Sequence, residues 1–163
     1  MATQPCPCGY HGDVTKPCSC TPQQIHRYRS RISGPLMDRI DIQIEVPSVK
    51  YKELSAEHGG EPSDNIRERV NKCRKTQYER FKRTKTKNNA QMTPKQITKY
   101  CAVDEEGHRL LENVVDKLGM SARAHARILK VSRTIADLEE SENIKPHHLS
   151  EAIQYRSLDR EVG

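Results

Sequence analysis

The sequence predicts a mainly α protein, in which a C-terminal helical bundle follows a truncated α/β remnant with a Cys-rich loop and one strand. Three observations support this fold class. Four cysteines lie within the first twenty residues, one segment alternates apolar with polar residues, and apolar residues recur every three or four positions from residue 64 onward. We therefore expect the remnant over 1–49, a linker over 50–63 and a helical domain over 64–163.

The first part of the remnant is predicted to be a loop that leads into a short helix. Prolines and glycines interrupt any regular structure over 1–21. Thr21 then resembles a helix N-cap, and Pro22 occupies the first helical position that proline favours. The helix is expected to end at about Arg31, before Gly34 and Pro35.

A single strand is predicted after this helix. Ile40, Ile42, Ile44 and Val46 alternate with polar residues, which is typical of a strand with one buried face. A lone strand is not stable without neighbours, and the rest of the sequence offers no clear partner. We therefore expect this chain to be a fragment of a larger α/β domain.

Helical periodicity dominates the rest of the sequence. The segment from Asp64 to Lys85 predicts a long basic amphipathic helix, and Thr93-Pro94 begins a shorter one. Further helices are expected over 104–118, after the N-cap Ser121, and from Pro146. The stripe of Ala124, Ile128, Val131, Ile135 and Leu138 predicts that the helix after Ser121 carries the core face of a bundle.

The charge balance favours a polyanionic partner. The chain has 28 Lys and Arg against 22 Asp and Glu, a net charge of +6. Candidate DNA-binding residues lie on the long basic helix, although the same pattern also fits a solvated helix face. They are Lys72, Arg74, Lys75, Arg80, Lys82, Arg83 and Lys85.

No run of about 18 apolar residues is present, so we expect no membrane span and a cytoplasmic location.

In a reducing compartment paired thiols are more often metal ligands than disulfides. Cys6, Cys8, Cys18 and Cys20 are therefore candidate zinc ligands, with His11 as a substitute. The alternative is that these four cysteines are free or adventitiously oxidised. Cys73 and Cys101 are expected to be inert apolar residues within helices.

Several segments together resemble the C-terminal portion of the magnesium chelatase-related YifB/ComM family. They are Gln4–Tyr10 with its Cys-Pro-Cys-Gly motif, the second thiol pair, Arg31–Asp41, Ser121–Ala124 and Arg133–Leu138. The resemblance implies an AAA+ ATPase. Members named ComM are hexameric DNA helicases that drive branch migration during natural transformation.

The resemblance also implies roles for two arginines. Arg39 matches the arginine finger, which reaches the nucleotide of a neighbouring subunit, and Arg123 matches the sensor-2 arginine of the helical lid. Both would contact ATP phosphates in a full-length protein that binds ATP and Mg²⁺ and self-associates as a hexamer. From the residues alone, an ion pair of Arg39 with Asp38 or Asp41 is the favoured interpretation, because structural ion pairs also use such arginines.

No G-x-x-x-x-G-K-[ST] motif occurs, so this chain by itself is expected to be inactive as an ATPase. Two other functions remain open. The chain could be a zinc-stabilised nucleic-acid-binding module that acts alone, or a part of a chelatase-type ATPase subunit that acts on a protein partner.

Overall fold

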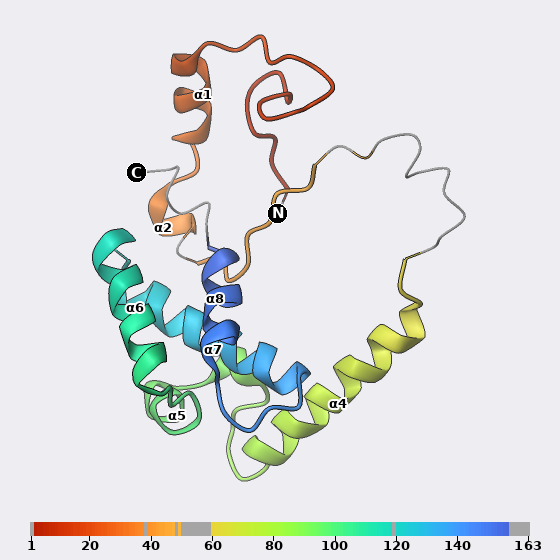
Figure 1. The fold of residues 1–163 in the computed structure, drawn as a ribbon, viewed down its shortest axis with the longest axis vertical. Coiled ribbons are helices and arrows are strands. Elements are labelled where there is room, and N and C mark those ends of the chain that lie inside the picture. Colours follow the sequence, from red (N-terminus) through yellow and green to blue (C-terminus); the bar gives the residue numbers. More distant parts are fainter. Residues whose placement is uncertain (1, 38, 48, 50–59, 119, 157–163) are drawn as a thin grey trace. The chain divides into compact units, whose positions relative to one another are not determined.

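The structure is a computed structural model that describes residues 2–37, 39–47, 49, 60–118 and 120–156. The described residues form two compact units, one within residues 1–58 and the other within residues 59–157. All regular elements that they contain are helices (Figure 1), so the predicted mainly α class is confirmed. Most of the predicted linker, residues 50–59, lies outside the described residues.

The first unit contains two short helices after the Cys-rich loop. Helix α1 spans Pro22–Arg29, and its N-cap is the predicted Thr21. The Thr21 hydroxyl accepts from the backbone N–H of Gln24, while the Gln24 side chain accepts from the backbone N–H of Thr21, a complete capping box. Helix α2, Gly34–Met37, was not predicted, because Gly34 and Pro35 suggested a turn rather than the first residues of a helix.

The predicted strand over 40–46 is wrong for the described residues, none of which adopts strand geometry there. Three of its four alternating apolar side chains remain in water: Ile42 is 52% exposed, Ile44 65% and Val46 79%, whereas Ile40 is partly buried. The pattern is that of a strand, but no partner strand is present among the described residues, and an unpaired strand has no stabilising ladder.

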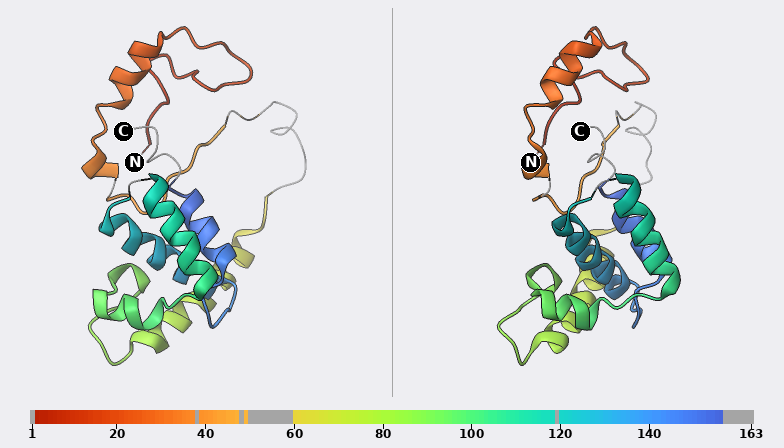
Figure 2. Two further views of the ribbon diagram at one scale, coloured as in Figure 1. Left: turned by 60° about the vertical axis from the view of Figure 1, so that its left-hand side comes forward. Right: turned by 90° about the vertical axis from the view of Figure 1, so that its left-hand side faces the viewer.

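The second unit contains the helices that the periodicity predicted. Helix α4 spans Ser63–Phe81, α5 Pro94–Tyr100, α6 Glu105–Leu118, α7 Ala122–Leu138 and α8 Pro146–Gln154. A 3₁₀ turn, η1, spans Asn89–Gln91 between α4 and α5 and was not predicted. Thr93 and Ser121 cap α5 and α7 as expected. Figure 2 shows these helices from two further sides. None of the helices described is both long and apolar enough to cross a bilayer.

Helix α7 forms the centre of this unit and packs against α8, α4, α5 and η1. Ala124, Ile128 and Ile135 of the predicted stripe are buried, together with Leu129 and Ala136, whereas Leu138 at the end of the helix is exposed. The core is completed by apolar residues from every neighbouring element, among them Phe81, Met92, Cys101, Leu111, Ile144, Leu149 and Ala152.

Helices α6 and α8 approach each other closely at Gly107. A methyl group on Gly107 would lie 2.9 Å from Leu149 Cδ1 and 3.0 Å from Val103 Cβ. Such distances are too short for carbon atoms in contact, so a glycine is needed for this packing. Leu149 is itself fully buried, which leaves it little room to move aside.

A buried carboxylate, Asp137 near the end of α7, joins three elements. Arg80 of α4 donates to both carboxylate oxygens, at 2.5 and 2.6 Å, and Arg133 donates through Nε at 3.1 Å. Asn89 of η1 donates to the same carboxylate at 2.8 Å. Arg133 also donates to the carbonyl oxygens of Ser141 and Glu142. We call these four residues, Asp137, Arg80, Arg133 and Asn89, the Asp137 network.

We expect replacement of Asp137 by Asn to destabilise the protein by about 3–5 kcal/mol, because two guanidinium groups would be left in a mostly buried site without a counter-charge. The measurement is urea denaturation followed by circular dichroism. Asp116→Asn, which neutralises an exposed carboxylate on α6, is the matched control and should change stability by less than about 0.5 kcal/mol. Equal effects of the two substitutions would contradict the role of the network.

Candidate metal centre and exposed arginines

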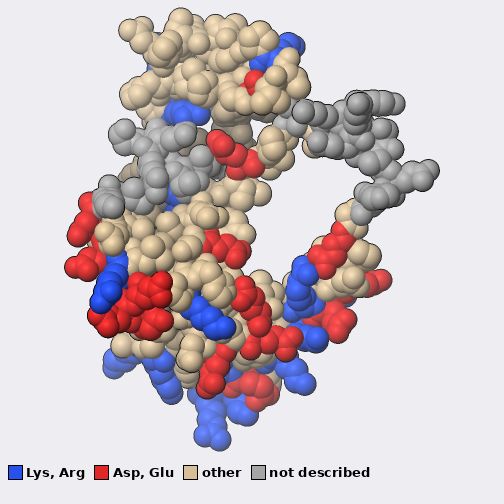
Figure 3. Space-filling model, viewed as in Figure 1, with Lys and Arg blue, Asp and Glu red and all other residues tan. Residues whose placement is uncertain are grey.

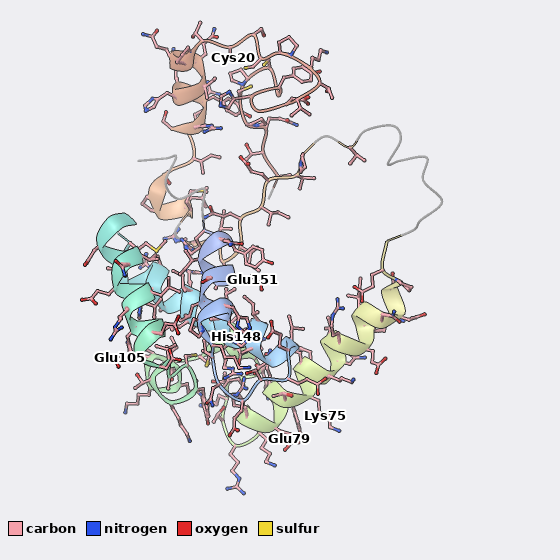
Figure 4. The ribbon with its side chains drawn as sticks, viewed as in Figure 1. Cys20, Lys75, Glu79, Glu105, His148 and Glu151 are labelled. Atoms are coloured by element: carbon pink, nitrogen blue, oxygen red, sulfur yellow. The ribbon has the colours of Figure 1, made fainter. Side chains whose placement is uncertain are left out.

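The four N-terminal cysteines converge, as their spacing predicted. Cys6 Sγ lies 3.3 Å from Cys8 Sγ and 3.8 Å from Cys18 Sγ, and Cys8 Sγ lies 3.5 Å from Cys18 Sγ. All four sulfur atoms, including that of Cys20, lie within 4.8 Å of one another. Figure 4 labels Cys20 among these side chains. These separations exceed a disulfide bond of about 2.05 Å, and all four cysteines are free of disulfide bonds.

Local turns hold the two thiol pairs in place. Gly9 adopts φ +82°, a left-handed conformation that suits glycine, and its N–H donates to the carbonyl of Cys6 at 3.0 Å. Further along the loop, the Asp13 carboxylate accepts from the backbone N–H groups of Thr15 and Lys16. Arg29 of α1 donates to the carbonyl of Pro5 at 3.2 Å and so ties the loop to the helix that follows it.

The electrostatic surroundings of the thiols differ within the cluster. The backbone N–H groups of Tyr10 and Ser19 donate to Cys8 and lower the pKa of its thiol to about 5. For Cys20 the loss of hydration is the largest influence and raises the pKa to about 12. Cys8 is therefore a thiolate at neutral pH, and Cys20 in the absence of a cation is a thiol.

The donor set fits a zinc ion. Four thiolates at about 2.3 Å from a tetrahedral Zn²⁺ would lie about 3.8 Å from one another, close to the separations observed. Four protein ligands leave no open position, which is typical of structural rather than catalytic zinc. His11 is exposed and is not part of the cluster, so its suggested role as a substitute ligand gains no support.

The other two cysteines lie in the second unit and are buried. Cys73 is within α4, as expected, whereas Cys101 directly follows α5 as its C-cap. Burial raises the pKa of the Cys101 thiol to about 11, and it also raises that of Cys73. Both are therefore protonated and unreactive at neutral pH.

The two arginines that the resemblance singles out are both exposed. Arg39 follows α2 in the first unit, and its backbone N–H donates to the carbonyl oxygen of Leu36. Arg123 lies in the first turn of α7 in the second unit, two residues after the Ser121 cap. Neither side chain contributes to the core, so both are accessible to a ligand. Asp38, one suggested ion-pair partner of Arg39, lies outside the described residues.

The candidate DNA-binding residues divide into two groups. Arg80 is committed to Asp137, with only 13% of its side chain exposed, and we remove it from the set. The other six candidates, Lys72, Arg74, Lys75, Lys82, Arg83 and Lys85, are exposed. Lys72 faces Glu68 and Glu140 at 3.5 and 3.8 Å.

Sequence reasoning missed a second group of metal-binding residue types, Glu139, His147 and His148. The Nε2 atoms of His147 and His148 lie 3.0 and 2.9 Å from the same Glu139 oxygen, and these bonds lower the pKa of Glu139. His148 Nδ1 accepts from the backbone N–H of Lys145. Its proton is therefore on Nε2, which donates to Glu139 and is not free to bind a metal. This group joins the end of α7 to the start of α8.

Comparison with known proteins gives consistent matches along the chain. Residues 60–156 match the family model described as magnesium chelatase, subunit ChlI C-terminal, and residues 1–54 match that of magnesium chelatase, subunit ChlI. The chain is 41% identical over 161 residues to the uncharacterized protein YifB of Salmonella typhimurium. It is 42% identical over 160 residues to the competence protein ComM of Haemophilus influenzae. Each alignment covers 98% of this chain and 30% of the relative.

We expect the reduced chain to bind one zinc ion and Cys8→Ser to lose most of it, because three protein ligands hold a structural zinc much less tightly than four. Elemental analysis of protein purified without chelators measures the stoichiometry. Replacement of zinc by Co²⁺ should add the visible absorption of a tetrahedral thiolate site. Cys73→Ala, which removes a thiol outside the cluster, should retain the metal. Metal-free reduced protein, or equal loss from both variants, would overturn the assignment.

Proposed function

Because the chain belongs to the magnesium chelatase-related family that includes YifB and ComM, we propose that it is the C-terminal part of an AAA+ ATPase motor. The chain spans about 30% of the length of the relatives it matches. The observation that carries the proposal is that the two family matches follow in order along the chain, with an exposed arginine in each. In this proposal the first unit supplies Arg39 and the second supplies Arg123.

The two arginines would act on the phosphates of ATP. Arg39 as an arginine finger would stabilise the negative charge that develops on the γ-phosphoryl group during hydrolysis. Arg123 as the sensor-2 arginine would couple the same phosphate to the position of the helical unit. Both roles require a guanidinium, which stays charged and presents two N–H donors to an oxyanion in a fixed geometry. Exposure of both side chains supports the proposal.

The nucleotide itself would be bound by sequence outside this chain. No phosphate-binding glycine motif occurs in the 163 residues, so ATP and Mg²⁺ are expected to be held elsewhere in a longer protein. An arginine finger acts on the site of a neighbouring subunit, which is why the proposal includes self-association as a hexamer. The thiol cluster would contribute a structural zinc that fixes the loop preceding α1.

We further propose that the motor acts on DNA as a helicase in branch migration. The name of the ComM relative refers to competence, and the exposed cations of the second unit suit a polyanionic partner.

An alternative is a zinc-stabilised nucleic-acid-binding module that acts alone, which the convergence of four thiols favours. A chelatase-type ATPase subunit that acts on a protein partner is a third candidate, in keeping with the description of the matching family.

The test uses a chimera in which this chain replaces the matching segment of Haemophilus influenzae ComM. We expect the chimera to hydrolyse ATP, and Arg39→Ala to lower its turnover by about 10³-fold, the lower end of the effect of an arginine finger. Arg123→Ala should lower turnover by about 10-fold or more, because one charge-assisted contact to the phosphate is lost. Steady-state ATP hydrolysis measures both effects.

Arg109→Ala is the matched control for these substitutions. Arg109 is an exposed arginine on α6, paired with Glu105 at 2.5 Å, and its loss should leave turnover within about two-fold of the unsubstituted chimera. The proposed roles would be refuted if neither Arg39→Ala nor Arg123→Ala lowered turnover in chimeras with unchanged circular dichroism. Turnover by the isolated 163-residue chain would contradict the assignment of nucleotide binding to sequence outside it.

A further inference from the structure

The connection between α4 and α5 carries an unusual concentration of positive charge. Between Glu79 and Asp104 the sequence contains no acidic residue but has seven cations. Arg80 is turned inward to Asp137, and the remaining six are exposed. We call these six residues the α4–α5 cationic surface: Lys82, Arg83, Lys85, Lys87, Lys95 and Lys99. Lys and Arg side chains gather at this end of the second unit (Figure 3).

Hydrogen bonds hold the backbone of this segment in one shape. The Thr86 hydroxyl, which is nearly buried, donates to Gln96 Oε1 of α5 at 2.9 Å. The backbone N–H of Lys87 donates to Gln91 Oε1 at 2.9 Å. Asn89 is 1% exposed, accepts from Arg80 at 2.9 Å and donates to Asp137. The cations on this segment therefore project from a fixed backbone, so fewer degrees of freedom are lost when a partner binds.

A further cation reaches the same segment from α7. Lys130 Nζ donates to the carbonyl oxygen of Ala90 in η1 at 2.8 Å. Positive charge from α4, from the connection, from α5 and from α7 thus meets at one end of the unit. Figure 2 shows from two directions that α5 and the connection lie beside the C-terminal end of α4.

The first half of α4 differs from this surface, although its content of cations is similar. Arg67 pairs with Asp64, Arg69 forms a two-pronged pair with Glu61 at 2.7 and 2.9 Å, and Lys72 faces Glu68. Their charges are largely compensated locally, and a polyanion would have to compete with the acidic partners. Within the part of the chain that the structure describes, only Lys82 of the α4–α5 cationic surface has such a partner, Glu79 at 2.6 Å.

We propose that the α4–α5 cationic surface is the part of this chain that binds the phosphate backbone of nucleic acid. The proposal rests on the DNA-directed function above and narrows it, since it moves the contact from the whole of α4 to its end, the connection and α5. Closely spaced phosphates match a row of lysines without acidic interruptions. Binding of this type is salt-dependent and reads no base sequence.

The test compares two triple variants of the 163-residue chain, each with three fewer positive charges. The surface variant removes three charges from the α4–α5 cationic surface by Lys85→Gln, Lys87→Gln and Lys95→Gln. The control variant removes three cations that are paired with acidic residues elsewhere, by Arg67→Gln, Arg69→Gln and Arg109→Gln. Fluorescence anisotropy with labelled single- and double-stranded DNA, from about 50 to 200 mM salt, measures affinity. The surface variant should bind about 10- to 100-fold more weakly at about 0.1 M salt, with a salt slope reduced by about 2 to 3. The control should bind within about three-fold of the unsubstituted chain.

Three outcomes would overturn the proposal. The first is equal weakening by both triple variants when circular dichroism shows both to be folded. The second is an unsubstituted chain that binds no DNA at low salt. The third is polyglutamate competing as well as DNA at equal charge, which would indicate an acidic protein as the partner. If one of these outcomes is found while ATP hydrolysis by the chimera still depends on Arg39 and Arg123, only this proposal fails and the proposed motor function is retained.

Discussion

The organisation of the helical unit depends on one buried carboxylate. Asp137 accepts from Arg80, Arg133 and Asn89, so α4, η1 and the turn after α7 are all fixed relative to α7. Two guanidinium groups and one carboxylate leave a surplus positive charge, which the carbonyl oxygens of Ser141 and Glu142 help to solvate. The apolar core packs against α7 over most of its length, but at the C-terminal end of α7 the hydrogen bonds and ion pairs of Asp137 determine the positions of α4 and η1. The connection that carries the cationic surface is held in place by the same carboxylate.

The thiol cluster is organised on a different scale. All of its ligands and supporting turns lie within the first twenty residues, and Arg29 links it to α1. Its formation therefore requires little loop closure and no packed core. Two kinds of order coexist in this chain: a local one that a metal ion would strengthen, and a cooperative one that a buried ion network and an apolar core maintain. A change in either one should leave the other largely intact.

Periodicity and capping residues were sufficient to predict most of the helices, because Thr21, Thr93 and Ser121 make local contacts that the sequence contains in full. The convergence of the four cysteines was also predictable, since their pairs are separated by a short loop. The Asp137 network was not, because its members are up to 57 residues apart and no local sequence pattern marks them as buried. For the same reason Arg80 was assigned to the DNA-binding set. The tautomer of His148 was likewise unpredictable, because it follows from the contact of its Nδ1 with the backbone N–H of Lys145.

The alternating segment from Ile40 to Val46 has a consequence for the behaviour of the molecule in solution. Ile42, Ile44 and Val46 keep half or more of their surface in contact with water, and each would gain free energy from any apolar surface that covered it. Their spacing means that a neighbouring sheet edge could cover all three at once and add main-chain hydrogen bonds. These three side chains are exposed here, although Gln43 between them is buried. Beside a suitable sheet edge the segment would pair as a strand, and at high concentration a second copy could serve as that edge and promote self-association.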